Sequence, residues 1–135
     1  MPTSLNYNPE HSHQVSVYDV EYQPGWNARI YQPEGGDPFP ALLFVHGGAW
    51  NFGTRTSQEE FNRGIAASGL VVMAPDFRLA PDHPYPAQVE DVNYAMRWLK
   101  AHASEFNASP FSIGGLGSSS GGHTMMLAAM RPDDP

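Results

Sequence analysis

The stretch Gly117-Ser118-Ser119-Ser120-Gly121 lies between a short apolar run at residues 111–116 and a helix-like run at residues 122–130. It fits the pattern G-x-S-x-G, in which a serine occupies a sharp, strained turn between a strand and a helix. The two glycines carry no Cβ atom, so they allow neighbouring backbone to approach the turn closely. The pattern predicts a strand, a tight turn and a helix in that order, with Ser119 as a candidate nucleophile.

The helix after this turn offers a second chemical element. The first N–H groups of a helix have no acceptor within the helix, so the N–H of Ser120 can donate a hydrogen bond to an oxyanion that forms on an attacked carbonyl. A stretch of Gly and Ser is also typical of a flexible loop. The catalytic interpretation therefore depends on the rest of the chain.

A second motif, His46-Gly47-Gly48-Ala49-Trp50, directly follows an apolar run at residues 40–45 that is typical of a strand buried on both faces. In enzymes with such a serine turn, further oxyanion donors are backbone N–H groups of an HGGG-type loop, and Gly47 and Gly48 stand at those positions. An ordinary turn is the alternative. Two motifs at strand ends, about 70 residues apart and in this order, favour catalysis.

With a third segment, DFRLAPDHPYPA at residues 76–87, these motifs resemble the hormone-sensitive-lipase-like and feruloyl-esterase-like carboxylesterases of the α/β-hydrolase fold. The third segment is similar to that family's DYRLAPEHPFPA nearly residue for residue, and the likeness runs from about Val15 onward. The resemblance implies hydrolysis of small acyl or aromatic esters through a Ser-His-Asp triad. It also implies roles for individual residues: Ser119 as nucleophile, Gly47, Gly48 and Ser120 as oxyanion donors, and Trp50 in the substrate pocket.

Two positions depart from this family pattern. Ala49 replaces a third glycine, and Ser118 replaces the Asp of GDSAGG, which removes a carboxylate beside the nucleophile. Variants with HGGAW also resemble arylformamidases. Amide hydrolysis by the same machinery is therefore an alternative to ester hydrolysis.

The acid and the base of the triad are expected outside these 135 residues. In α/β hydrolases both follow the serine, each on a loop after a further strand, and only 16 residues follow Ser119 here. Asp133 and Asp134 lie in a proline-broken segment that predicts an exposed loop. We predict that residues 1–135 are the N-terminal part of one α/β-hydrolase domain, and that a second polypeptide supplies Asp and His. A non-catalytic truncated fragment is the alternative.

None of the histidines is predicted to be the catalytic base. His11 and His13 are expected to be solvated, and His46 is expected to hold the loop that it opens. His123 lies one helical turn beyond Ser119 rather than over its hydroxyl. The remaining two belong to a proline-rich segment and to the end of a helix, and they are His83 and His102.

Hydrophobic patterning predicts an α/β fold in which an antiparallel hairpin leads into a mostly parallel sheet with helices on both faces. The hairpin is expected at residues 15–22 and 26–31, further strands at 41–45, 70–74 and 111–116, and helices at 57–67, 87–105 and 122–130. The family resemblance places the strand before Ser119 beside strand 41–45, with its other edge open.

Local signals add detail to this prediction. Ser57 and Glu60 fit a capping box at the start of the first helix, and Gly69 fits a stop signal after its end. The polar residues of the third segment are predicted to be structural, fixing the loop after strand 70–74 beside the oxyanion loop. They are Asp76, Arg78, His83 and Tyr85.

Global features exclude several classes. Without cysteine there is no disulfide, thiol chemistry or Cys-type zinc site, and we expect no metal or cofactor. A net charge of −7 with scattered basic residues gives no support for nucleic-acid binding. No apolar run approaches membrane-spanning length, and the N-terminus lacks a signal-peptide pattern, so we expect a cytoplasmic protein.

Overall fold

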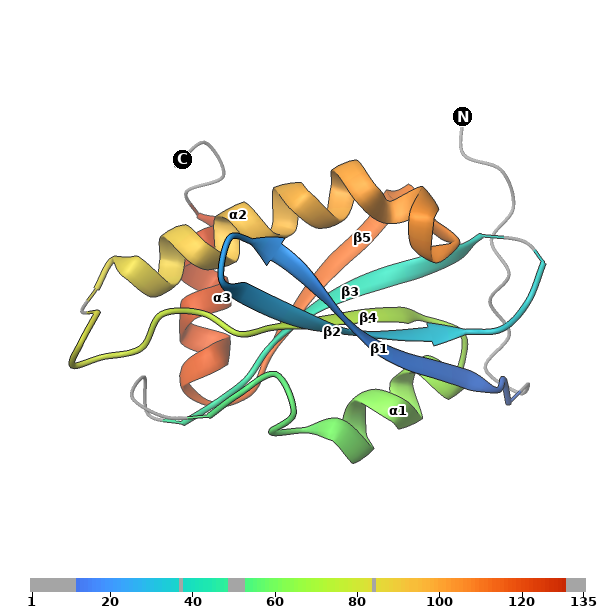
Figure 1. Cartoon of the computed structure of the whole chain (residues 1–135), viewed down its shortest axis with the longest axis horizontal. Coiled ribbons are helices and arrows are strands. Elements are labelled where there is room, and N and C mark those ends of the chain that lie inside the picture. The colour runs from blue at the N-terminus through green and yellow to red at the C-terminus, as the bar shows by residue number, and fades with distance from the viewer. Residues whose placement is uncertain (1–11, 37, 49–52, 84, 131–135) are drawn as a thin grey trace.

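The computed structural model describes residues 12–36, 38–48, 53–83 and 85–130. Within these residues one sheet of five strands has the order β1-β2-β4-β3-β5 (Figure 1). The strands are β1 (Val15–Gln23), β2 (Trp26–Pro33), β3 (Phe39–Val45), β4 (Val71–Pro75) and β5 (Ala108–Gly117). The helices are α1 (Glu59–Ala67), α2 (Ala87–His102), the 3-10 helix η1 (Ala103–Phe106) and α3 (Ser120–Ala129).

The sheet begins as the predicted hairpin and continues as the predicted parallel portion. β1 and β2 pair antiparallel, and β2 joins β4 antiparallel. β3 then runs parallel to both β4 and β5, with Leu43 opposite Met73 on one side and Gly115 on the other. The strand that precedes Ser119 therefore lies beside β3, which confirms the prediction. β5 forms one edge of the sheet as far as the described residues extend.

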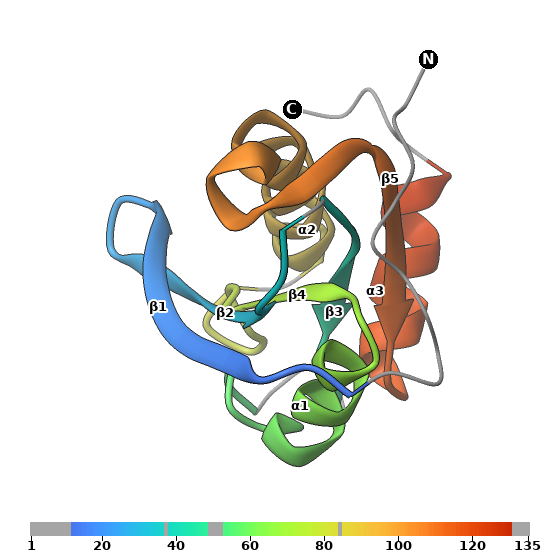
Figure 2. The same cartoon turned by 90° about the vertical axis from the view of Figure 1, so that its right-hand side faces the viewer.

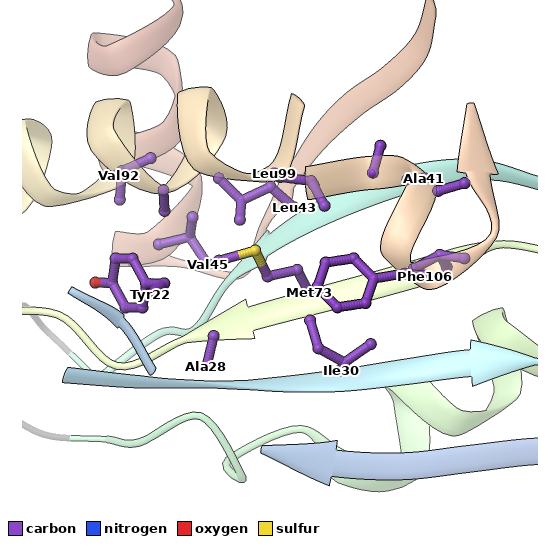
Figure 3. Close-up of a cluster of buried hydrophobic side chains, with 14 of the residues drawn as sticks. Tyr22, Ala28, Ile30, Ala41, Leu43, Val45, Met73, Val92, Leu99 and Phe106 are labelled. Atoms are coloured by element: carbon purple, nitrogen blue, oxygen red, sulfur yellow. The ribbon is translucent and has the colours of Figure 1, made fainter. Parts of the chain in front are cut away.

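Helices cover both faces of this sheet, as the alternating pattern predicts. Figure 2 shows α1 on one side of the sheet and α2 on the other. The larger core lies under α2 and contains Tyr22, Val45, Met73 and Leu99 (Figure 3). A smaller cluster under α1 includes Phe44. The strands beneath both helices are apolar on both faces because both faces are buried.

The helix predicted at residues 87–105 carries an apolar stripe in the structure. Val89, Val92 and Leu99 are buried on the face that packs against the sheet. α2 ends at His102, and η1 carries the chain to Phe106. The predicted helical span is thus correct, but its last turn is tightened into a 3-10 helix.

Two local predictions are wrong. No side chain caps α1, whose N-cap is Gln58; the hydroxyl of Ser57 instead accepts a hydrogen bond from the N–H of Thr54 at 2.8 Å. His13 is half-buried rather than solvated, and its ring packs edge-on against Phe39 with ring centroids 5.1 Å apart. The stop signal at Gly69 is confirmed by its φ of 110° and its N–H bond to the helix.

No described helix is long and apolar enough to cross a membrane. The described residues also contain no group of three or more His, Asp or Glu side chains that could hold a metal ion.

Arg78 fastens the loop after β4 to the start of α2. Its Nε and Nη2 donate to the two carboxylate oxygens of Asp91 at 3.0 and 2.9 Å, and its backbone N–H donates to the same carboxylate at 2.8 Å. The Asp91 side chain is only 5% exposed. Removing the guanidinium would therefore leave a buried carboxylate with fewer donors.

We predict that Arg78→Ala lowers the free energy of unfolding by about 2 kcal/mol, because a desolvated charge loses its partner. Arg63→Ala is the matched control, since Arg63 is half-exposed and lies 3.9 Å from Glu59, where a surface pair contributes about 0–1 kcal/mol. Thermal unfolding measures both variants. A large fall in turnover at an unchanged melting temperature in Arg78→Ala would contradict this structural role.

Candidate active site

Ser119 occupies the strained turn that the sequence predicts. It lies two residues after the end of β5, forms the N-cap of α3, and has φ 53° and ψ −119°. A non-glycine residue in this region of backbone space costs about 1–3 kcal/mol and persists only where its surroundings enforce it. The backbone therefore displays this side chain at the junction between a strand and a helix.

Two glycines make this junction possible. A Cβ atom at Gly117 would lie 2.4 Å from the carbonyl oxygen of Gly121, and one at Gly121 would lie 2.1 Å from the carbonyl oxygen of Val45. No side chain fits at such distances. The N–H of Ser118 donates to the same Val45 oxygen at 3.1 Å. The end of β3, the turn and the first residues of α3 thus pack backbone against backbone.

The loop between β3 and α1 touches this junction. A Cβ atom at Gly47 would lie 2.8 Å from the carbonyl oxygen of Ser118 and 3.3 Å from the Cβ of Ser119. The next residue, Gly48, has φ 136°, a conformation that favours glycine. Among the described residues, neither glycine N–H donates a hydrogen bond. Ser120 is buried as the first residue of α3, whereas Trp50 lies outside the described residues.

His46 supports this β3–α1 loop through contacts of its side chain. Its buried ring stacks on Phe77 with centroids 4.4 Å apart, and its Nδ1 lies 2.8 Å from the carbonyl oxygen of Gly47. A carbonyl oxygen can only accept, so Nδ1 carries the proton. Burial lowers the pKa of His46, against the opposing effect of the Gly47 hydrogen bond. The ring is therefore neutral at pH 7 and holds the loop, as the sequence predicts.

None of the described histidines accepts a hydrogen bond from the hydroxyl of Ser119. His123 donates its backbone N–H to the carbonyl oxygen of Ser119 at 3.3 Å, and its exposed side chain lies one turn along α3. His123 lines a cavity of about 260 Å³ between α3, the start of α2 and the loop after β4, which includes Tyr85. The hydroxyl of Ser119 makes no hydrogen bond within the described part of the chain. Within the described residues, Gly47 thus lies against the turn that holds Ser119 and Ser120, and no side chain there accepts a hydrogen bond from the Ser119 hydroxyl.

The polar cluster predicted in the third segment is divided in the structure. Asp76 binds Arg55 of the β3–α1 loop, whereas Arg78 binds the helix α2. His83 and Tyr85 are exposed. Arg55 escaped the sequence analysis, because an arginine in a loop carries no local signal of its partner 21 residues away.

A sheet with this order, a strained serine between β5 and α3, and helices on both faces define an α/β hydrolase. Within that class, the chain belongs to the BD-FAE family, which matches residues 29–134. The carboxylic ester hydrolase LipN of Mycobacterium tuberculosis is 42% identical over 109 residues, which are 79% of this chain and 29% of LipN. The carboxylesterase NlhH of the same organism is 34% identical over 108 residues, 78% of this chain and 34% of NlhH.

Solved structures agree with this assignment. A bacterial heroin esterase has a TM-score of 0.82 and 30% sequence identity, and the match covers 89% of this chain and 40% of that protein. The chain therefore spans about a third of the two sequence relatives and two fifths of the solved structure.

The glycine at position 121 gives a sharp test of this geometry. We predict that Gly121→Ala lowers stability by about 3 kcal/mol or more, because its Cβ would overlap the backbone of β3. Gly122→Ala is the control, since the nearest atom to its Cβ would be 3.4 Å away and alanine favours a helix. Chemical denaturation compares the two; equal stability of both variants would contradict the packing described.

Proposed function

We propose that this chain supplies the nucleophile and the oxyanion-binding groups of a serine carboxylesterase. In this proposal Ser119 attacks the ester carbonyl, and the N–H groups of Gly47, Gly48 and Ser120 stabilise the oxyanion. The observation that carries the proposal is the strained backbone of Ser119, held at the start of α3 with Gly47 packed against it. Such a turn is maintained at an energetic cost that a structural serine does not require.

The proposed reaction follows the acyl-enzyme route. The hydroxyl of Ser119 loses its proton to a histidine as its oxygen bonds to the carbonyl carbon, whose own oxygen becomes negative. Fixed N–H donors stabilise that charge where it develops, which lowers the barrier. The alcohol then leaves with the proton from the histidine. Water, activated by the same base, releases the acid and restores the serine.

The histidine and its aspartate are proposed to lie on a second polypeptide. Within the described residues one edge of β5 is unpaired, which supports this idea, because the unpaired N–H and C=O groups of a sheet edge can pair with a strand of another chain. A cavity borders each face of β5. One of about 330 Å³ lies beside α2 and α3, and one of about 200 Å³ lies beside α1. On β5 itself, Phe111 is 74% exposed. A strand with covering helices would bury this surface.

Ester hydrolysis is favoured over amide hydrolysis by the relatives. LipN is a carboxylic ester hydrolase and NlhH a carboxylesterase by name, and the solved structure is a heroin esterase. A comparison of p-nitrophenyl esters with N-formyl aromatic amines separates the two reactions. The proposed substrate is a small ester that needs no metal or cofactor for its hydrolysis.

Ser119→Ala tests the nucleophile. In the active protein we expect turnover of a p-nitrophenyl ester to fall by several orders of magnitude, because the members of a triad act as a unit. An organophosphonate should add its mass to this chain at Ser119, as read by peptide mass spectrometry. Ser118→Ala is the control for a neighbouring hydroxyl. Labelling at Ser118 or Ser120 would overturn the assignment.

A complementation experiment tests the second polypeptide. Residues 1–135 alone are expected to be oligomeric or poorly soluble and inactive, because β5 and its flanking cavities stay uncovered. Co-expression with the part of heroin esterase that this chain does not match should restore solubility and turnover. Size-exclusion chromatography and an ester assay measure both. A monomeric, fully active chain of residues 1–135 would refute this arrangement.

A further inference from the structure

The β3–α1 loop is held at both of its described ends by two consecutive residues that follow β4. We propose that Asp76 and Phe77 are positioning residues for the oxyanion-binding groups, acting through Arg55 and His46. The inference rests on the proposed role of Gly47 and Gly48.

The first contact fixes one peptide group. Phe77, itself buried, stacks on the ring of His46 with an interplanar angle of 18°. The ring in turn donates its Nδ1 proton to the carbonyl oxygen of Gly47 at 2.8 Å. In a trans peptide, the C=O of one residue and the N–H of the next point in opposite directions. Holding the Gly47 carbonyl against the buried ring therefore directs the N–H of Gly48 away from it.

The second contact fixes the other end of the loop. The carboxylate of Asp76 accepts two hydrogen bonds from Arg55, one from the backbone N–H and one from Nη1, both at 2.6 Å. Asp76 is itself tied into the sheet, because its N–H donates to the carbonyl oxygen of Asn27 at 2.8 Å and its carbonyl accepts from the hydroxyl of Tyr22. Asp76, which is anchored at the end of the sheet, therefore holds both the backbone and the side chain of Arg55.

The two described ends of the loop contact each other at Gly53, which packs against His46 and Gly47. A Cβ atom at Gly53 would lie 2.5 Å from Nδ1 of His46 and 2.7 Å from the carbonyl oxygen of Gly47. The chain just before Arg55 is thus packed on the same ring and peptide that Phe77 supports. A shift of Arg55 would reach the peptide of Gly47 and Gly48 through this contact.

Arg55 also belongs to a wider charged network. Its Nη2 donates to Asp19 at 3.1 Å, Asp19 accepts from Arg29 at 2.9 Å, and Arg29 reaches Glu59 at 2.6 Å. Hydrogen bonds from Arg29 and Arg55 lower the pKa of Asp19 to about 2, so the network stays charged at neutral pH. These pairs are partly exposed, and such pairs contribute little to stability. We therefore expect these ion pairs to affect the position of the loop more than the stability of the protein.

The test compares Asp76→Asn with Glu59→Gln, which removes a charge from the same network without touching Arg55. In the complemented protein, Asp76→Asn should lower kcat about tenfold or more while KM changes less than about twofold, because small displacements of a stabilising group act on the transition state. Hydrogen exchange of peptides covering residues 46–48 and 53–58 should accelerate. Glu59→Gln should change neither quantity.

Phe77→Leu provides a second variant that keeps an apolar side chain at the buried position. It should accelerate exchange at residues 46–48 in the same way, even if Asp76→Asn fails to fold. Unchanged exchange in both variants, or an equal fall of kcat in Asp76→Asn and Glu59→Gln, would overturn the proposal. If Ser119→Ala keeps full turnover while exchange still accelerates, the proposed function fails, and Asp76 and Phe77 support the loop without a role in catalysis.

Discussion

The backbone contact between the end of β3 and the start of α3 is the constraint on which the rest of the site depends. Gly121 lies so close to the carbonyl of Val45 that a methyl group would have no room. This contact packs the start of α3 against the end of β3. Ser119, which lies between Gly117 and Gly121, is held in a backbone conformation that non-glycine residues rarely adopt. Strain at one residue is sustained by packing at its neighbours, which is the usual arrangement at functional positions.

The β3–α1 loop is supported by a different strand, and this division has a physical reason. β3 leads into the start of the loop, but the two residues that hold its ends, Asp76 and Phe77, directly follow β4. Because β4 is paired on both sides, by β2 and β3, its end is anchored more firmly than a loop could be. A group that must meet developing charge without rearranging benefits from such an anchor. In the proposed enzyme, the neutral ring of His46 would transmit this support without adding charge near the oxyanion.

Sequence patterns predicted the fold well because its strands are apolar runs and its helix α2 carries a regular stripe, both of which are local signals. The turn at Ser119 was equally predictable, since only glycine satisfies the close contacts on either side of it. The capping box at Ser57 failed because that hydroxyl accepts a bond from the preceding turn instead. Arg55 was missed because its importance lies in its partner Asp76, in the loop after β4, and no spacing rule encodes such a pairing.

The position of β5 links stability to chemistry in the proposed enzyme. β5 ends two residues before Ser119, yet within the described residues it is paired on one side only, by β3. The strained turn therefore packs against Gly47 on one side, while the strand before it, β5, has an unpaired edge within the described residues. A strand added to that edge would restrict the motion of β5 and bring its own loops to the same end of the sheet as Ser119, because the ends of parallel strands lie together. Completion of the sheet and completion of the triad would then be one event.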